Sequence, residues 1–151
     1  MPIPSLRRPF TAPKNLCVLR RSPSKRVRLL LDSHVLLWAL LEPGKLAGPA
    51  ATEIASPANV VFVSTASVWE LEIKRASGKL VLPDDWLEAL DEAGFIDLPI
   101  KRHHGMTAAR LPWHHRDPFD RLLIAQAMSE GLQFVTADRF AAAYGVPVLQ
   151  A

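Results

Sequence analysis

The sequence predicts an α/β fold in which a central parallel sheet carries helices on both of its faces. Short apolar runs of strand length recur along the chain, and each is followed by a segment whose apolar residues have helical spacing. This alternation is typical of parallel strands joined by right-handed helical crossovers. The chain has 151 residues, of which 49% are hydrophobic, so we expect one compact domain with a buried core.

Two strand-then-helix units occupy the first half of this domain. Their expected elements are a strand at 27–31, a helix at 33–42, a small helix at 51–55, a strand at 60–63 and a helix at 66–76. A Pro-Gly pair ends the first helix, and Ser64 or Thr65 is expected to cap the helix that follows the second strand. Both strands therefore run directly into helices.

The second half repeats the alternation. The expected elements are a helix at 83–93, a short edge strand at 95–98, a helix at 100–110, a loop at 112–118, a helix that ends at Gly131, and strands at 133–136 and 146–149. Pro83 and the two acids after it have the composition of a helix N-terminus. In sheets of this kind ligands bind beyond the carboxyl ends of the strands.

The net charge of +3 is unevenly distributed along the chain. The first 28 residues hold eight Lys or Arg and no acid, so the remaining residues have 10 basic and 15 acidic side chains and a net charge of −5. We expect residues 1–27 to be a basic, disordered extension and residues 28–151 to be the folded domain. The extension has three open interpretations: an RNA-binding arm, an upstream stretch translated from a misassigned start, or a targeting peptide.

The sequence predicts a cytoplasmic protein that does not enter a membrane. The longest apolar stretch, residues 29–41, is short for a bilayer span and is interrupted by Asp32 and His34. Cys17 is the one cysteine, which excludes an intramolecular disulfide and a multi-cysteine zinc site and fits a reducing compartment.

Four acids lie at strand-to-helix junctions or in the helix just after one. They are Asp32, Glu70, Asp120 and Asp138. If the strands are parallel, all four converge on one edge of the sheet. Each also has a structural interpretation: Asp32 and Asp138 as helix caps, and Glu70 as the partner of Lys74 one helical turn away.

Asp120 is the acid that a structural role explains least. It lies on the same helical stripe as Leu123, Ile124 and Ala127, where an unpaired carboxylate is costly to bury. A cation removes that cost, and several carboxylates together suit Mg²⁺ or Mn²⁺. Such a site activates water for attack on a phosphodiester. We therefore predict that the four acids bind a metal and act in catalysis.

Other side chains near these acids are secondary candidates. Ser33, Ser67 and Thr136 are placed to orient carboxylates or waters, or serve as capping hydroxyls. Asp117 fits the N-cap position before Pro118 and is expected to have a structural role.

Three stretches together resemble the PIN-domain family, and closely the VapC-type toxins of type II toxin–antitoxin pairs. They are LLLDSHVLLWALL, VSTASVWELEIKRASGKL and HHRDPFDRLLIAQAMSEGLQFVTAD, and the resemblance covers residues 28–150. It implies a three-layer α/β/α domain, Mg²⁺- or Mn²⁺-dependent endoribonuclease activity and inhibition by a cognate antitoxin. The family's four acids fall on Asp32, Glu70, Asp120 and Asp138, and Asp117 belongs to the DPFD signature of one branch.

The resemblance also implies an RNA substrate, with transfer RNA and a ribosomal RNA loop both compatible. Candidate RNA-binding residues are Lys74, Arg116, Arg121 and Trp113. We expect a homodimer with a groove for an antitoxin segment.

The remaining aromatic and histidine residues have expected positions as well. Trp38 and Trp69 lie in apolar helical patterns and are expected in the core. The pairs at 103–104 and 114–115 are expected in loops or on helix surfaces rather than as metal ligands, with His114 or His115 in contact with substrate phosphate.

Two other classes of function stay open at this point. A small-molecule phosphohydrolase also uses aspartates after parallel strands, but the first strand is followed by Asp-Ser-His without a second aspartate two residues on. A non-catalytic PIN-fold interaction protein would use the same acids as caps and ion pairs. Metal binding that is lost on substitution of Asp32 or Asp120 separates the enzyme from the interaction protein.

Overall fold

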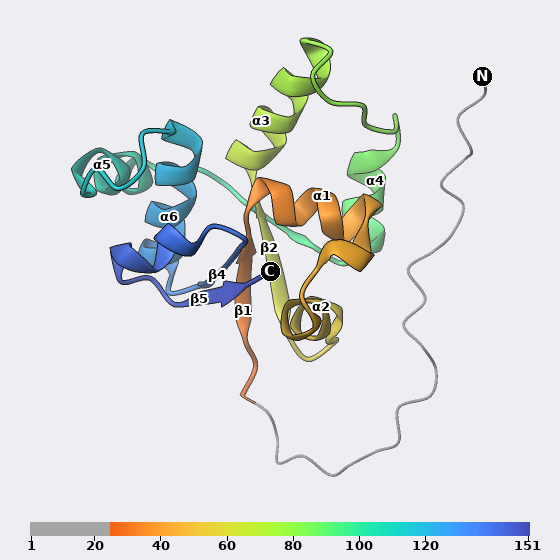
Figure 1. Cartoon of the computed structure of the whole chain (residues 1–151), viewed down its shortest axis with the longest axis horizontal. Coiled ribbons are helices and arrows are strands. Elements are labelled where there is room, and N and C mark those ends of the chain that lie inside the picture. Colours follow the sequence, from red (N-terminus) through yellow and green to blue (C-terminus); the bar gives the residue numbers. More distant parts are fainter. Residues whose placement is uncertain (1–24) are drawn as a thin grey trace.

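The computed structural model describes residues 25–151 and contains a five-stranded sheet with helices on both faces (Figure 1). The strand order is β3-β2-β1-β4-β5, and every neighbouring pair is parallel. The strands are β1 (Arg28–Leu31), β2 (Val60–Ser64), β3 (Ile96–Leu98), β4 (Gln133–Thr136) and β5 (Val148–Gln150). The predicted parallel α/β fold is confirmed, whereas residues 1–24 of the predicted basic extension lie outside the described residues.

The helices connect these strands. They are α1 (Ser33–Leu41), α2 (Gly48–Ala55), α3 (Thr65–Ala76), α4 (Trp86–Glu92), α5 (Arg102–Arg110) and α6 (Pro118–Glu130), with short 3₁₀ helices η1 (Pro43–Lys45) and η2 (Arg139–Tyr144). In Figure 1, α1 and α2 lie on one side of the strands and α5 and α6 on the other. No helix of residues 25–151 is long and apolar enough to cross a bilayer.

The central strand β1 supplies both halves of the core. Leu29, Leu30 and Leu31 are fully buried, as expected for a parallel strand covered on both faces. Successive side chains point to opposite faces. Leu29 and Leu31 belong to the cluster formed with α1, α2 and α4, whereas Leu30 belongs to the cluster formed with α6 and η2. This arrangement produces the three layers.

Some predicted boundaries are wrong. The helix expected at 83–93 begins only at Trp86, because the Trp86 N–H bonds to the Pro83 carbonyl and the two acids between them form a turn. The last strand is shifted to Val148–Gln150, and η2 was not expected. Pairing with β4 sets the position of the last strand. The N-cap Asp138 and the left-handed Gly145 bound η2.

The expected helix caps are confirmed at two positions. The Ser64 hydroxyl accepts from the Ala66 N–H and begins α3, and Asp117 accepts from the Phe119 N–H at 2.8 Å and begins α6. Gly131 ends α6 in the left-handed conformation, with φ of 63°, as a C-terminal glycine does. These caps place the first turn of α6 beside the end of β1.

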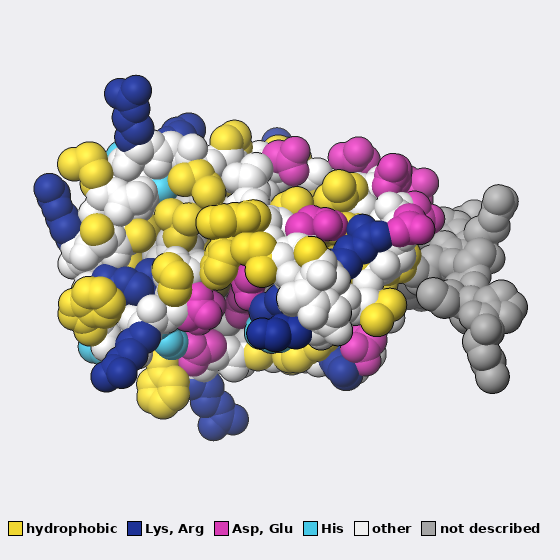
Figure 2. Space-filling view, turned by 90° about the horizontal axis from the view of Figure 1, so that it is seen from above, with side chains coloured by type: hydrophobic (Ala, Val, Ile, Leu, Met, Phe, Trp, Pro, Cys, Tyr) yellow, Lys and Arg dark blue, Asp and Glu magenta, His cyan; other side chains and the backbone are white. Residues whose placement is uncertain are grey.

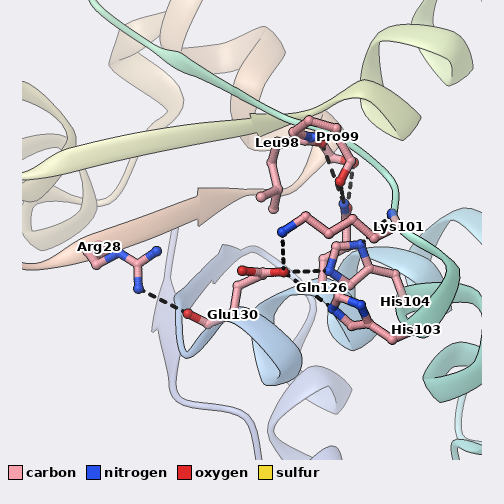
Figure 3. A network of polar contacts seen from close by, with 9 residues as sticks. Arg28, Leu98, Pro99, Lys101, His103, His104, Gln126 and Glu130 are labelled. Atoms are coloured by element: carbon pink, nitrogen blue, oxygen red, sulfur yellow. Dashed lines mark hydrogen bonds and ion pairs between the residues drawn. The ribbon is translucent and has the colours of Figure 1, made fainter.

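Gln126 ties α6 to the strands on the far side of β1. Its fully buried side chain accepts from the Ser64 hydroxyl at 2.5 Å and donates to the Pro99 carbonyl at 3.3 Å. Figure 3 shows this amide reaching the chain just after β3. The edge strand β3 has three residues, so a side-chain bond from α6 adds to its attachment.

Replacing Gln126 with Ala should lower the free energy of unfolding by about 2–3 kcal/mol, because it opens a cavity and leaves buried polar groups without partners. Urea unfolding measures the change. Gln150→Ala, at an exposed position of the other edge strand, is the matched control and should change stability by less than about 0.5 kcal/mol. Equal effects of the two substitutions would contradict this role for Gln126.

Candidate functional site

Asp32 lies at the end of the central strand, and its side chain faces the interior rather than capping α1. The carboxylate is 8% exposed and accepts from the Thr136 hydroxyl, at the end of β4, at 2.8 Å. It makes no capping bond to α1, so the alternative that Asp32 is a helix cap is wrong. Burial is the main cause that raises the pKa of Asp32, and the nearby Glu70 charge adds to it.

Asp120 lies in the first turn of α6 and faces the same region. Burial raises its pKa to about 6, and the charges of Asp32, Asp117 and Glu70 act in the same direction, whereas His115 opposes them. The Asp32 charge thus destabilises the charged form of Asp120. This is the carboxylate repulsion that the sequence predicted for this helix.

A pocket of about 390 Å³ opens where these carboxylates meet. Its lining includes Asp32, Asp120, Asp138, Thr136, His115 and Trp38. Seen from the carboxyl ends of the strands, acidic side chains gather near the middle of this face, with histidine, basic and hydrophobic side chains around them (Figure 2). The structure therefore brings three of the four predicted acids into one pocket.

Glu70 lies beside this pocket and not in its lining. It is 9% exposed, accepts from the Ser33 hydroxyl at 2.6 Å, and pairs with Lys74 at 2.6 Å. The expected pairing of Glu70 with Lys74 is present, although on a buried rather than an exposed carboxylate. Its charge contributes to the raised pKa values of Asp32 and Asp120.

Asp138 has two roles. One carboxylate oxygen accepts from the Phe140 N–H at 2.8 Å and caps η2, which agrees with the interpretation of Asp138 as a helix cap. The other lies 2.9 Å from the His115 Nε2, without hydrogen-bond alignment. The Asp138 N–H donates to the Thr136 hydroxyl at 3.0 Å, so Thr136 connects the chain at Asp138 to the Asp32 carboxylate.

The loop before α6 is held by a residue whose position sequence reasoning did not predict. Arg121 is 5% exposed, and its guanidinium donates to four carbonyl oxygens at 2.7–3.2 Å, those of Ala108, Leu111, Pro112 and His115. These include carbonyls at the end of α5, where a cation is favourable. Arg121 thus stabilises the loop that leads His115 to the pocket.

Tyr144 is the second residue that holds the loop carrying His115, and no sequence signal indicated it. Its hydroxyl accepts from the His115 N–H at 2.6 Å, and its ring stacks against the His115 ring at 5.5 Å. Tyr144 lies on η2, which the periodicity did not reveal. The contact therefore forms only when the fold brings η2 next to the loop before α6.

The remaining predicted tryptophan, arginine and histidine side chains differ in how much of them is exposed to solvent. Trp113 is 75% exposed on the loop before α6, and Arg116 is exposed nearby. Trp38 is half-buried and packs against the core, whereas the core position expected for Trp69 is wrong because its side chain is 62% exposed. His104 is fully buried, which contradicts the expected surface position.

A PIN domain model matches residues 29–146 of this chain. The chain belongs to the PIN-domain family. Among curated proteins, this PIN domain is similar to Ribonuclease VapC22 of Mycobacterium tuberculosis, with 35% identity over 115 residues that make up 74% of this chain and 87% of the relative. The family resemblance carried by the three sequence motifs is confirmed.

Solved structures share the fold. They include DNA-bound VapBC from Salmonella typhimurium, with a TM-score of 0.60 and 15% identity, and VapBC2 from Rickettsia felis bound to a DNA fragment from their promoter, with a TM-score of 0.59 and 11% identity. Each match covers 82% of this chain and 98% of the other chain. Similarity at this identity concerns the fold alone, and it supports the three-layer architecture of this PIN domain.

The side chains of this PIN domain fit a divalent cation. Among residues 25–151, no Lys or Arg forms an ion pair with Asp32 or Asp120, although both carboxylates are partly or fully buried. The Ser67 hydroxyl, which is 1% exposed and lies one helical turn before Glu70, has no hydrogen-bond partner in the same part of the chain. Oxygen donors with uncompensated negative charge are the chemistry that Mg²⁺ and Mn²⁺ prefer.

A second cluster with ligand-type atoms fits a metal less well. Donor atoms of His103, His104 and Glu130 lie within 4.8 Å of one another. Figure 3 shows the two histidine side chains beside the Glu130 carboxylate. The His104 Nδ1 accepts from the Lys101 N–H at 2.9 Å, so its proton is on Nε2, which lies 2.8 Å from Glu130. That nitrogen donates to the carboxylate instead of offering a lone pair. The cluster joins the start of α5 to the end of α6.

The raised pKa of Asp120 predicts a pH-dependent stability. The pKa of Asp120 is about 6 in the folded chain and 3.8 in the unfolded chain. Between these pH values the folded state binds more protons than the unfolded state, so stability falls as pH rises. Asp120→Asn removes this charge. In the presence of a chelator, we expect the variant to melt at a higher temperature than the wild type at pH 7.5, with the difference shrinking towards pH 4.

Thermal unfolding followed by circular dichroism measures this difference. Asp97→Asn, at an exposed position of β3, is the matched control and should leave the melting temperature unchanged at both pH values. An Asp120→Asn variant that is less stable than the wild type at pH 7.5, or whose stabilisation does not vary with pH, would contradict the electrostatic account.

Proposed function

We propose that this PIN domain is a metal-dependent endoribonuclease that cuts RNA phosphodiester bonds and acts as a toxin neutralised by a cognate antitoxin. The observation that carries the proposal is the pocket in which Asp32, Asp120 and Asp138 meet, with Glu70 beside it. Two of these carboxylates have raised pKa values and form no ion pair with Lys or Arg among the described residues. The similarity to a protein named Ribonuclease VapC22 supports RNA as the substrate.

Asp32, Glu70, Asp120 and Asp138 are the proposed ligands of Mg²⁺ or Mn²⁺. When bound, the ion would lower the pKa of an attacking water and offset the charge that develops on the phosphate. The protein's own part is to hold the carboxylates in place. Thr136 donates to Asp32 and Ser33 donates to Glu70, so each hydroxyl orients one acid.

Ser67 and Asp117 have supporting roles in this proposal. The Ser67 hydroxyl has no hydrogen-bond partner among residues 25–151 and lies on the same helix as Glu70, so it is proposed to hold a water molecule at the site. Asp117 caps α6 and adds negative charge near Asp120, which strengthens the preference of that carboxylate for a cation. Ser67 therefore supports the site from α3, which carries Glu70, and Asp117 supports it from the start of α6, which carries Asp120.

Lys74, Arg116 and Trp113 are the proposed contacts to RNA. Lys74 pairs with Glu70 at the site, Arg116 is exposed on the loop before α6, and Trp113 exposes its ring on the same loop. Arg121, an RNA candidate from sequence, uses its guanidinium on carbonyl oxygens and supports the loop instead. The proposed phosphate contacts thus come from side chains that remain accessible.

The proposed biological setting follows from the relatives. The solved VapBC structures support a cognate antitoxin as partner, and we propose a homodimer of residues 28–151 that acts in the cytoplasm. A folded part with a net charge of −5 would then bind RNA through local basic side chains and through acids neutralised by metal. The basic extension at 1–27 is proposed to lie outside the nuclease domain.

Purified protein should cut a pool of total transfer and ribosomal RNA with Mg²⁺ or Mn²⁺ and should be inactive with chelator. Asp120→Asn should reduce the cleavage rate by at least about 100-fold, because it removes a proposed metal ligand and its charge. Gel analysis of the fragments and mapping of their ends measure the activity.

Asp97→Asn, prepared in the same way, controls for contaminating ribonucleases and for the loss of one carboxylate far from the pocket. It should cut at the wild-type rate. Cleavage that resists chelator, or that is the same in the Asp120 and Asp97 variants, would contradict the proposed nuclease.

The proposed assembly predicts a particle of twice the 16.7 kDa chain mass for the isolated protein. Co-expression with the product of the neighbouring gene should give a larger, co-purifying complex in which RNA cleavage is suppressed. Light scattering coupled to size exclusion measures both masses. A chain that stays monomeric alone and after co-expression would contradict the proposed dimer and partner.

A further inference from the structure

Three consecutive residues at the start of α6 point in different directions around the helix. Successive residues of an α-helix are rotated by about 100°, so the side chains of Phe119 and Arg121 leave on opposite sides of Asp120. Each of the two contacts a tryptophan ring that is exposed to solvent. Asp120 therefore lies between two exposed aromatic side chains.

The first of these is Trp69, on α3. It is 62% exposed, and its ring meets the half-buried Phe119 ring edge to face, with centroids 5.3 Å apart and an angle of 64°. Edge-to-face contacts stabilise aromatic pairs beyond the area that they bury. Phe119 therefore supports one edge of Trp69 and leaves much of the indole free.

The second is Trp113, on the loop before α6. It is 75% exposed and lies over the Arg121 guanidinium, 4.1 Å from the ring centroid. Because Arg121 is itself held by four carbonyl oxygens, the indole rests on a well-anchored cation. One face of Trp113 is thus supported, and the opposite face is available.

Exposing two tryptophan rings to water is unfavourable, because large aromatic side chains favour burial. Their contacts with Phe119 and Arg121 cover only part of each ring. Aromatic rings with a free face beside basic side chains are typical of proteins that stack single-stranded nucleic acid bases. Arg116 lies three residues after Trp113 and Lys74 five residues after Trp69, so each ring has a cation on its own element. Phosphates next to a stacked base would meet these cations.

We propose that Trp69 and Trp113 are stacking platforms for unpaired bases on the two sides of the phosphate at Asp120. The proposal rests on the proposed nuclease function and specifies its substrate: the nucleotides that flank the cut are single-stranded when bound. Duplex RNA is a poor ligand because its paired bases do not offer free faces to the two indoles.

An antitoxin segment is the competing occupant of these rings. A helix in a groove requires a continuous apolar face, whereas Trp69 and Trp113 are separated by the first turn of α6 and its carboxylate. Two separate rings on either side of an acidic pocket fit successive bases around one phosphate better. The observations therefore favour the nucleic acid.

Binding without cleavage tests the platforms directly. The protein carries Asp120→Asn, and the probe is a fluorescein-labelled 12-nucleotide single-stranded RNA of mixed sequence, alone or annealed to its complement, in Mg²⁺. Fluorescence anisotropy measures the Kd. Trp69→Ala and Trp113→Ala should each weaken single-strand binding by at least about fivefold, and Trp→Phe at either position should restore most of it. Duplex binding should be weak and insensitive to both changes.

Val81→Ala is the matched control, since Val81 is 77% exposed and lies between α3 and α4, away from the pocket lining. Alanine variants that bind the single strand as the Val81 variant does would overturn the proposal. So would variants that keep RNA binding and lose only the co-expressed antitoxin.

The result separates this proposal from the proposed function. If the wild type does not cut RNA but the tryptophan variants lose single-strand binding, the platforms stand and the nuclease fails. If the wild type cuts RNA in an Asp120-dependent way and the tryptophan variants show unchanged KM and kcat and unchanged Kd, the nuclease stands and the platforms fail.

Discussion

The proposed metal site depends on a buried carboxylate at the end of the central strand. Asp32 follows β1, whose three leucines are fully buried, and it lies near Asp120 without a Lys or Arg ion pair among the described residues. Burying two such charges together is unfavourable unless a cation compensates them. The parallel sheet creates this situation, because it brings the ends of β1 and β4 and the start of α6 to one place. The fold therefore concentrates charge repulsion at the proposed metal site.

A second set of contacts keeps this concentrated charge in a defined geometry. Thr136 connects Asp32 with the chain at Asp138, and Ser33 and Lys74 hold Glu70. Further out, Arg121 and Tyr144 hold the loop that brings His115 to Asp138. Most of these contacts join residues far apart in sequence. Such preorganised supports are what a metal site needs in order to hold like charges close together before the ion arrives.

The local spacing of apolar residues was sufficient to predict the strands, the main helices and the position of the acids relative to them. Asp32 and Asp138 each follow an apolar strand within two residues, so parallel topology predicted that these two acids meet. Asp120 lies in the first turn of α6, and its place on an apolar helical stripe indicated it instead. What local pattern missed depends on tertiary contact. A helical apolar stripe predicted burial of Trp69, but no element of the described residues 25–151 fully covers its ring, which is 62% exposed. Arg121 was predicted to contact phosphate because nothing in the sequence reveals the carbonyl oxygens at the end of α5 that accept its hydrogen bonds.

The central claim is that the acids at the strand ends form a divalent metal site. A crystal structure of the wild-type protein grown with Mn²⁺, with anomalous diffraction recorded at the manganese edge, tests it most directly. The account predicts an anomalous peak between the carboxylates of Asp32 and Asp120, in the pocket that Asp138 also lines. Absence of a peak there at saturating Mn²⁺, or a peak only at the cluster of His103, His104 and Glu130, would contradict it.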